Sequence, residues 1–133
     1  MKIEHLPDAE LDVMKALWES SSPLKASEIA KRLSEKHSWK VPTVHALLSR
    51  LEEKGFVFAD RASYFHRFSA TVTEEEYLAS ESAKLLRRSG TKLPALVAAL
   101  MKSDEITDEE LEELSLLIDE KRKGFKSTKE TLK

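Results

Sequence analysis

Cysteine is absent from this sequence, and its absence excludes several kinds of chemistry. Disulfide bonds, thiolate zinc sites and thiol catalysis all require it. Glycine is scarce too, with three in 133 residues, and no glycine-rich phosphate loop or nucleophile elbow occurs. The four histidines lack the paired spacing of metal ligands. We therefore expect a protein that is not an enzyme and that binds neither a metal nor another cofactor.

Long apolar runs are also missing from the chain. No stretch approaches the roughly 18 to 20 apolar residues that cross a bilayer, and the first residues lack the apolar core of a signal peptide. No insertion into a membrane is expected, and the protein should act in the cytoplasm. Neither sign of charge dominates, since 22 Lys and Arg face 24 Asp and Glu. Binding to nucleic acid would therefore depend on where basic side chains gather, not on net charge.

The segment from residue 39 to 68 is the most informative part of the sequence. Its apolar residues first recur at the helical period and form a single stripe: Val44, Leu47, Leu48 and Leu51. Pro42 suits a first helical turn, while Lys54 and Gly55 supply a cationic last turn and a left-handed stop. The pattern predicts an amphipathic helix over about residues 41–54.

The residues after Gly55 predict a β-hairpin. Two runs, beginning at Phe56 and Tyr64, alternate aromatic or apolar residues with others, and residues 59–63 separate them. A two-stranded arm that follows a helix directly is typical of the wing in a winged helix-turn-helix.

Two further helices are predicted upstream. The helical period indicates one over residues 8–20 and a shorter one, capped by Ser27, that ends near Lys36. The shorter helix and the helix at 41–54 would form a helix-turn-helix pair, whose second member usually lies in the major groove of DNA. The expected fold is mainly α with a small β wing, and residues 1–71 would form a winged-helix DNA-binding domain.

The outer face of the predicted recognition helix and the hairpin supply the candidate contacts to DNA. The expected DNA-binding residues are Lys40, Pro42, Thr43, His45, Ala46, Ser49, Arg50, Arg61 and Arg67. Pro42 and Ala46 cannot donate a hydrogen bond to a base, although Ala46 can touch a thymine methyl group. Arg61 near the hairpin tip and Arg67 on the return strand suit phosphates, which accept most polar contacts in such complexes. Simple solvation is the alternative for each wing arginine and for His45.

Residues 72–122 have a different character and predict three short amphipathic helices. Thr73 and Thr107 each precede a glutamate by three residues, the capping-box pattern that opens a helix. Such helices cannot all bury their apolar stripes in one chain unless they fold back tightly, so we expect a homodimer; a monomeric core is the alternative. The candidate dimerisation residues are Tyr77, Leu78, Leu85, Leu93, Leu96, Val97, Leu100, Leu111, Leu114, Leu117 and Ile118. Residues 123–133 are expected to form a flexible tail.

These motifs resemble those of the BlaI/MecI group of penicillinase and methicillin-resistance repressors, which also includes the copper-responsive CopY repressors. The resemblance rests on A-E-L-x-V-M-x-x-L-W at residues 9–18 and T-V-x-x-L-L-x-R-L-x-x-K-G at residues 43–55, and it extends to about residue 122. It implies a homodimeric transcriptional repressor that binds a palindromic operator in double-stranded DNA. It also implies control of antibiotic-resistance genes of the β-lactamase type.

The same resemblance implies a route of induction. In the penicillinase branch a membrane-embedded sensor metalloprotease, directly or through a downstream protease, triggers cleavage of the repressor at an Asn-Phe bond. The corresponding position here is Ala99-Leu100, so that pair is absent, and this region is the expected place of any cleavage. The copper branch senses metal through a C-terminal cysteine cluster, which this chain lacks.

Part of the recognition helix departs from the family pattern. Thr43 fits it, whereas Lys40, Pro42 and Ala46 replace the residues that many members have, so the operator of relatives is not assumed. A winged helix can also serve as a protein-interaction adaptor without sequence-specific DNA binding, because fold does not fix function. The salt dependence of duplex binding would separate the two hypotheses.

Overall fold

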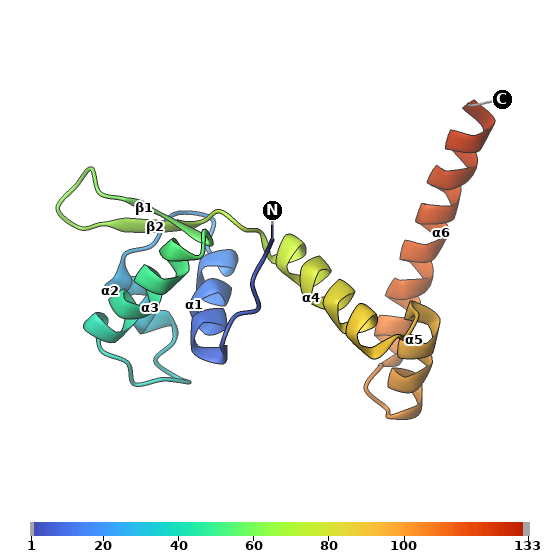
Figure 1. Ribbon diagram of the computed structural model, residues 1–133, viewed down its shortest axis with the longest axis horizontal. Helices are drawn as coiled ribbons and strands as arrows, with labels where there is room; N and C mark the ends of the chain where they lie inside the picture. The colour runs from blue at the N-terminus through green and yellow to red at the C-terminus, as the bar shows by residue number, and fades with distance from the viewer. Residues whose placement is uncertain (1, 132–133) are drawn as a thin grey trace. The chain divides into compact units, whose positions relative to one another are not determined.

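The computed structural model describes residues 2–131, with side chains described up to residue 124, and it confirms the mainly α fold with a small β wing (Figure 1). The elements of the described residues are α1 (Asp8–Glu19), α2 (Ala26–Arg32), α3 (Val41–Glu53), β1 (Val57–Asp60), β2 (Arg67–Ala70), α4 (Glu74–Ser89), α5 (Leu93–Lys102) and α6 (Asp108–Thr131). They divide into two compact units, unit 1 (residues 1–85) and unit 2 (residues 86–133). The division falls within α4, whereas the sequence placed the end of the first domain at residue 71.

The three helices α1, α2 and α3 of unit 1 pack around one core. The predicted stripe of α3 is buried in it, with no member more than 6% exposed: Val44, Leu47, Leu48 and Leu51. Val13 and Met14 of α1 meet this stripe and are 0% exposed. Burying a side chain of this size stabilises a fold by about 1.5–3 kcal/mol. The burial fixes which face of α3 remains outside.

The wing is a two-stranded antiparallel sheet with a longer loop than expected. Its register sets Asp60 opposite Arg67, so residues 61–66 connect the strands rather than residues 59–63. Phe68 of β2 is 4% exposed and belongs to the core. A slip of one residue would turn this ring to solvent, so burial fixes the register and leaves the extra residues to the loop.

The first turns of α4 belong to unit 1 because Tyr77 is buried there, at 4% exposure. Its hydroxyl accepts a hydrogen bond from the Leu6 backbone N–H at 3.0 Å. Its ring centroid lies 5.9 Å from those of both Trp18 and Phe56. The sequence assigned Tyr77 to a dimerisation surface, whereas in the single chain it packs in the core of unit 1. Helical spacing is the same in either role, and only tertiary packing distinguishes them.

α2 begins and ends earlier than predicted. Lys25, not Ser27, is its N-cap residue, and the Lys25 backbone N–H donates to the Glu28 carboxylate at 2.8 Å. Ala26 occupies the first helical position and is 3% exposed, so its burial and the Glu28 bond together override the capping preference of Ser27. Before Lys36 the helix gives way to turns, in which the Lys36 N–H donates to the carbonyl three residues back.

Unit 2 contains the end of α4 followed by α5 and α6. Thr107 opens α6: its Oγ1 accepts from the Glu110 N–H at 3.1 Å, and its own N–H donates to the Glu110 carboxylate at 3.0 Å. The predicted capping box is therefore confirmed. α6 then runs to Thr131 and includes most of the segment from residue 123 that the sequence assigned to a flexible tail. An established helix propagates more easily than it starts. Residues 132–133 of that tail lie outside the described residues.

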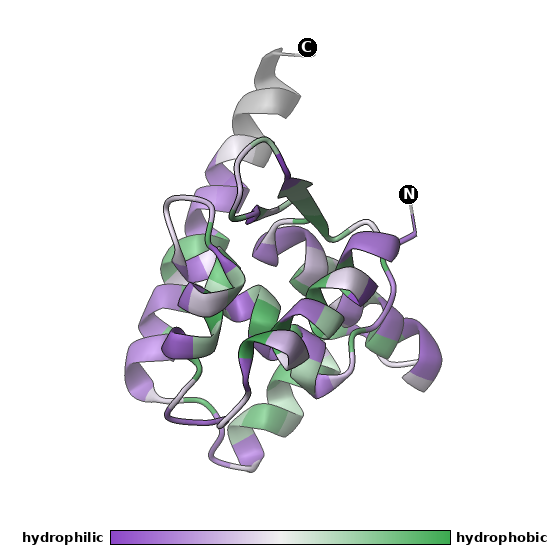
Figure 2. Cartoon of the chain, turned by 90° about the vertical axis from the view of Figure 1, so that its left-hand side faces the viewer, coloured by the Kyte–Doolittle hydropathy of each residue, from purple (hydrophilic) through white to green (hydrophobic). Residues whose placement is uncertain are grey.

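The helices carry both hydrophilic and hydrophobic residues along their length, coloured purple and green in Figure 2. In α5 no residue is buried. Leu116 and Leu117 of α6 are 62% and 63% exposed. Across the part of the chain that the structure describes, no helix combines the length and apolar character needed to span a membrane.

Candidate nucleic-acid interface

The outer face of α3 is open to solvent. Opposite the buried stripe, each residue that the sequence assigned to the groove face is exposed: Pro42, Thr43, His45, Ala46, Ser49 and Arg50. Lys40, the N-cap residue of α3, is exposed as well. The face therefore presents hydroxyl, imidazole and guanidinium groups, which can hydrogen-bond to base edges and phosphates. The structure brings these predicted residues together on one side of one helix.

A buried ion pair fixes the C-terminal end of α3 against α1. Lys54 Nζ lies 2.6 Å from Glu10 Oε1, and the Glu10 side chain is only 5% exposed. Removing one partner from such a pair would leave an uncompensated buried charge, which is strongly destabilising. The pair was not identified from the sequence. A signal existed, however, because Glu10 occupies the helical stripe of α1 that also contains Val13, Met14 and Leu17.

A second buried acid, Asp12, holds the turn between α2 and α3. Its carboxylate lies 3.1 Å from Lys36 Nζ and 2.8 Å from His37 Nε2. Burial acts to raise the pKa of Asp12, but the hydrogen bonds from His37 and Lys36 outweigh it and lower the pKa below its ordinary value. The His37 ring stacks on Trp39, with centroids 3.7 Å apart. These contacts tie α1 to the turn that precedes α3.

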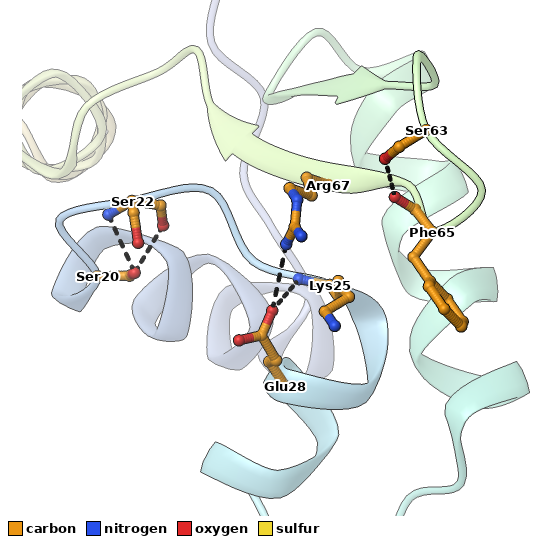
Figure 3. Close-up of polar contacts among 7 residues, drawn as sticks. All are labelled: Ser20, Ser22, Lys25, Glu28, Ser63, Phe65 and Arg67. Atoms are coloured by element: carbon orange, nitrogen blue, oxygen red, sulfur yellow. Dashed lines mark hydrogen bonds and ion pairs between the residues drawn. The ribbon is translucent and has the colours of Figure 1, made fainter.

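Both wing arginines face carboxylates on the helices of unit 1. Arg61 donates to the two carboxylate oxygens of Glu52 on α3, at 2.8 and 2.9 Å. Hydrogen bonding between them lowers the pKa of Glu52 and raises the pKa of Arg61. Arg67 Nη1 lies 4.0 Å from Glu28 Oε1, a looser pair (Figure 3). Neither of these predicted phosphate contacts is free of an acidic partner.

A hollow of about 440 Å³ lies between α2, α3 and the wing loop. It is lined by Lys25, Ala26, Ser27, Val41, His45, Tyr64, Phe65 and His66. Lys25 Nζ lies 5.3 Å from the centroid of the Phe65 ring, a cation–π arrangement, and Tyr64 is 90% exposed. Sequence reasoning treated Tyr64 as part of a strand and missed the pairing of Lys25 with Phe65. Two adjacent aromatic residues, which cannot both face one side of a strand, were the available signal.

The remaining candidate dimerisation residues lie on α4, α5 and α6. Those exposed are Leu78, Leu85, Leu93, Leu100, Leu117 and Ile118, and those half-buried are Leu96, Val97, Leu111 and Leu114. Ala99 and Leu100, the expected cleavage region, are exposed but lie inside the helical segment α5.

Comparisons with known proteins agree with the resemblance seen in the sequence. A sequence model of a family described as "Penicillinase repressor" matches residues 6–120. The penicillinase repressor of Bacillus licheniformis is 31% identical over 121 residues, which cover 90% of this chain and 93% of that protein. The methicillin resistance regulatory protein MecI of Staphylococcus aureus (strain N315) is 22% identical over 121 residues, covering 90% of this chain and 98% of its own length.

Solved structures of a repressor also match part of this chain. The solution structure of the DNA-binding domain of the repressor BlaI is 32% identical, with a TM-score of 0.49, and the match covers 58% of this chain and 94% of that one. A solution structure of monomeric Bacillus licheniformis BlaI in complex with the blaP half-operator is 33% identical, with a TM-score of 0.48, 57% of this chain covered and 92% of that one. From the extent of the sequence match, we conclude that this chain belongs to the penicillinase repressor family.

Proposed function

We propose that this protein is a homodimeric transcriptional repressor that binds palindromic operator DNA through α3. The observation that supports this function most strongly is that α3 is amphipathic, with its apolar stripe in the core and its polar face exposed. Membership of the penicillinase repressor family supports the same function, as does the half-operator bound to the related BlaI.

The side chains of α3 suit the major groove of DNA. A helix of 13 residues is about 20 Å long and enters a groove about 12 Å wide. Arg50 would hydrogen-bond to guanine, and Thr43 and Ser49 would bond to base edges or phosphates. Lys40 and the wing arginines would contact phosphates and position the helix.

The homodimer would form through unit 2. Apolar side chains on its helices are exposed in the single chain, and none in α5 is buried. A second copy would cover them, and the resulting two-fold symmetry would match a palindrome with half-sites one helical turn of DNA apart, or a multiple of it.

Release from the operator would follow proteolysis near Ala99 and Leu100. Both lie within α5, and proteases generally act on extended backbone, so cleavage would require local unfolding of this helix. Cleavage of α5 would weaken the dimer and therefore its binding to an operator with two half-sites. The protease would be a membrane-embedded sensor or a protease acting after it, and the controlled genes would be resistance genes of the β-lactamase type. The repressor itself would act in the cytoplasm.

The test is selection of bound sequences from random duplex DNA by the full-length protein, at rising salt and with the mass in solution measured alongside. We expect a palindrome bound by a dimer. Arg50→Ala should cost about 1–3 kcal/mol and relax the preference at one base pair. Lys102→Ala, which removes the same charge from unit 2, is the control. Absence of any enriched sequence, with weak duplex binding even at low salt, would favour the protein-interaction adaptor instead.

A further inference from the structure

Glu52 occupies one hydrogen-bonding edge of the Arg61 guanidinium, the edge formed by its two terminal nitrogens. Two parallel hydrogen bonds, at 2.8 and 2.9 Å, join the carboxylate oxygens to the two terminal nitrogens. This fork-to-fork geometry is the same one that a phosphate group would use. Arg61 therefore cannot bind a phosphate with this edge while it remains bonded to Glu52.

The pair links the wing to the recognition helix. Arg61 follows β1 directly, and Glu52 lies in the last turn of α3, so the pair joins the two elements that the proposed function turns toward DNA. Their side chains are 54% and 35% exposed, which means that a competing anion can reach them. An exposed pair of this kind is weak enough to exchange partners.

A second, looser pair repeats the arrangement on the other strand. Glu28 Oε1 lies 4.0 Å from Arg67 Nη1 and also accepts the hydrogen bond of the Lys25 backbone N–H at 2.8 Å (Figure 3). Glu28 therefore supports the N-terminus of α2 by accepting the Lys25 N–H and also lies opposite an arginine. Glu52 is the cleaner residue to test.

We propose that Glu52 restrains Arg61 and thereby limits the affinity of this protein for DNA of any sequence, with Glu28 acting in the same way on Arg67. The inference rests on the proposed function of operator binding. Affinity for arbitrary DNA comes mainly from cations that neutralise phosphates, so an arginine that must first leave a carboxylate contributes less of it. Base contacts from α3 do not depend on this exchange. The carboxylates therefore lower the affinity for the operator and for other DNA alike, and discrimination between them is left to the base contacts of α3.

The decisive comparison is Glu52→Gln against Glu53→Gln in the full-length protein. Glu53 is exposed and adjacent, so its substitution changes the net charge equally at almost the same place. Affinity for a short duplex of scrambled sequence is measured over a series of salt concentrations. We expect Glu52→Gln to bind several-fold more tightly than Glu53→Gln at low salt. Its plot of log affinity against log salt should be steeper by about 0.9, the value for one additional neutralised phosphate.

Arg61→Ala completes the test as a double-mutant cycle. It should weaken binding to scrambled duplex less in the wild-type background than in the Glu52→Gln background, where it should also abolish the gain. A purely structural role for the pair would not produce this dependence, and tryptophan-fluorescence unfolding checks that each variant is folded.

The outcomes separate this inference from the function on which it rests. If the wild type selects an operator but Glu52→Gln and Glu53→Gln bind scrambled duplex equally, the proposal that Glu52 restrains Arg61 is wrong. Operator binding then stands. If neither the wild type nor Glu52→Gln binds any duplex at low salt, both ideas are overturned.

Discussion

Unit 1 and unit 2 use the same kind of amphipathic helix but treat its apolar side differently. In α3 the stripe is buried to 6% exposure or less, whereas Leu93 of α5 and Leu117 of α6 are 58% and 63% exposed. Hydrophobic burial is favourable in proportion to the apolar area removed from water. Unit 1 completes its core within the chain, whereas unit 2 leaves apolar side chains exposed, and this exposure is the basis of the proposed homodimer.

The largest expected effect comes from the core of unit 1. Leu48→Ala removes a side chain that is 1% exposed and should lower the free energy of unfolding by about 2–5 kcal/mol. Trp18 and Trp39 both lie in unit 1, so denaturant unfolding followed by tryptophan fluorescence reports this loss. Leu78→Ala is the matched control, since that side chain is 58% exposed. Equal losses in both variants would mean that burial does not explain the contrast.

The next largest effect is expected for the exposed apolar side chains of unit 2. Leu117→Glu places a charge on an exposed apolar position and should weaken self-association at least about tenfold, roughly 1.4 kcal/mol. Sedimentation over a range of protein concentrations measures it, with Glu120→Gln on the same helix as the control. Unfolding of unit 1 in dilute protein should not change. A variant that remains as dimeric as the wild type would remove Leu117 from the proposed interface.

Low pH should weaken the polar contacts that tie α1 to the turn before α3. The pKa of Asp12 is lowered in the folded state, so its contribution to stability is present above the unfolded pKa, about 3.8, and is lost as pH falls through the lower folded pKa. Asp12→Asn should therefore cost about 1–3 kcal/mol at neutral pH. The difference from wild type should shrink below pH about 4. Unfolding measured against pH gives both values.

Glu19→Gln removes an exposed carboxylate from the same helix and serves as the control. Its free energy of unfolding should fall with decreasing pH in the same way as that of the wild type. If wild type and Asp12→Asn lose the same free energy of unfolding as pH falls, protonation of Asp12 does not contribute to the acid sensitivity of the fold.

The smallest effects concern two glycines with opposite roles. Gly90 has φ +66, so Gly90→Ala should destabilise the turn between α4 and α5 by about 1–2 kcal/mol. Gly124 lies inside α6, and a Cβ there meets no atom within 4 Å, so Gly124→Ala should add about 1 kcal/mol of helix stability. Helical circular dichroism on heating measures both. If both substitutions changed stability in the same direction, the backbone roles assigned to the two glycines would be wrong.

Local rules predicted the elements well where neighbours in sequence decide the structure. The stripe of α3, its proline near the start and the box at Thr107 are all such cases. Ser27 is the instructive failure. It has the right side chain for an N-cap, but α2 starts before it, because Ala26 is buried and Glu28 bonds to Lys25.

The candidate interface divides in the same way. Helical spacing alone placed Thr43, Ser49 and Arg50 on one outer face of α3. Spacing could not predict that Arg61 meets Glu52, since the wing loop returns to α3 only in the folded chain. Nor could it separate Tyr77, which packs in the core, from Leu78, which is exposed.

The sequence by itself determined the helices, the wing, the apolar stripes and the family of this protein, because these depend on residue order and on contacts within a few turns. Tertiary structure decided where α4 leaves the first unit, which acids lie buried and which arginines already have carboxylate partners. Those outcomes depend on side chains brought together from distant parts of the chain. Their energies come from burial and charge pairing, which no local pattern contains.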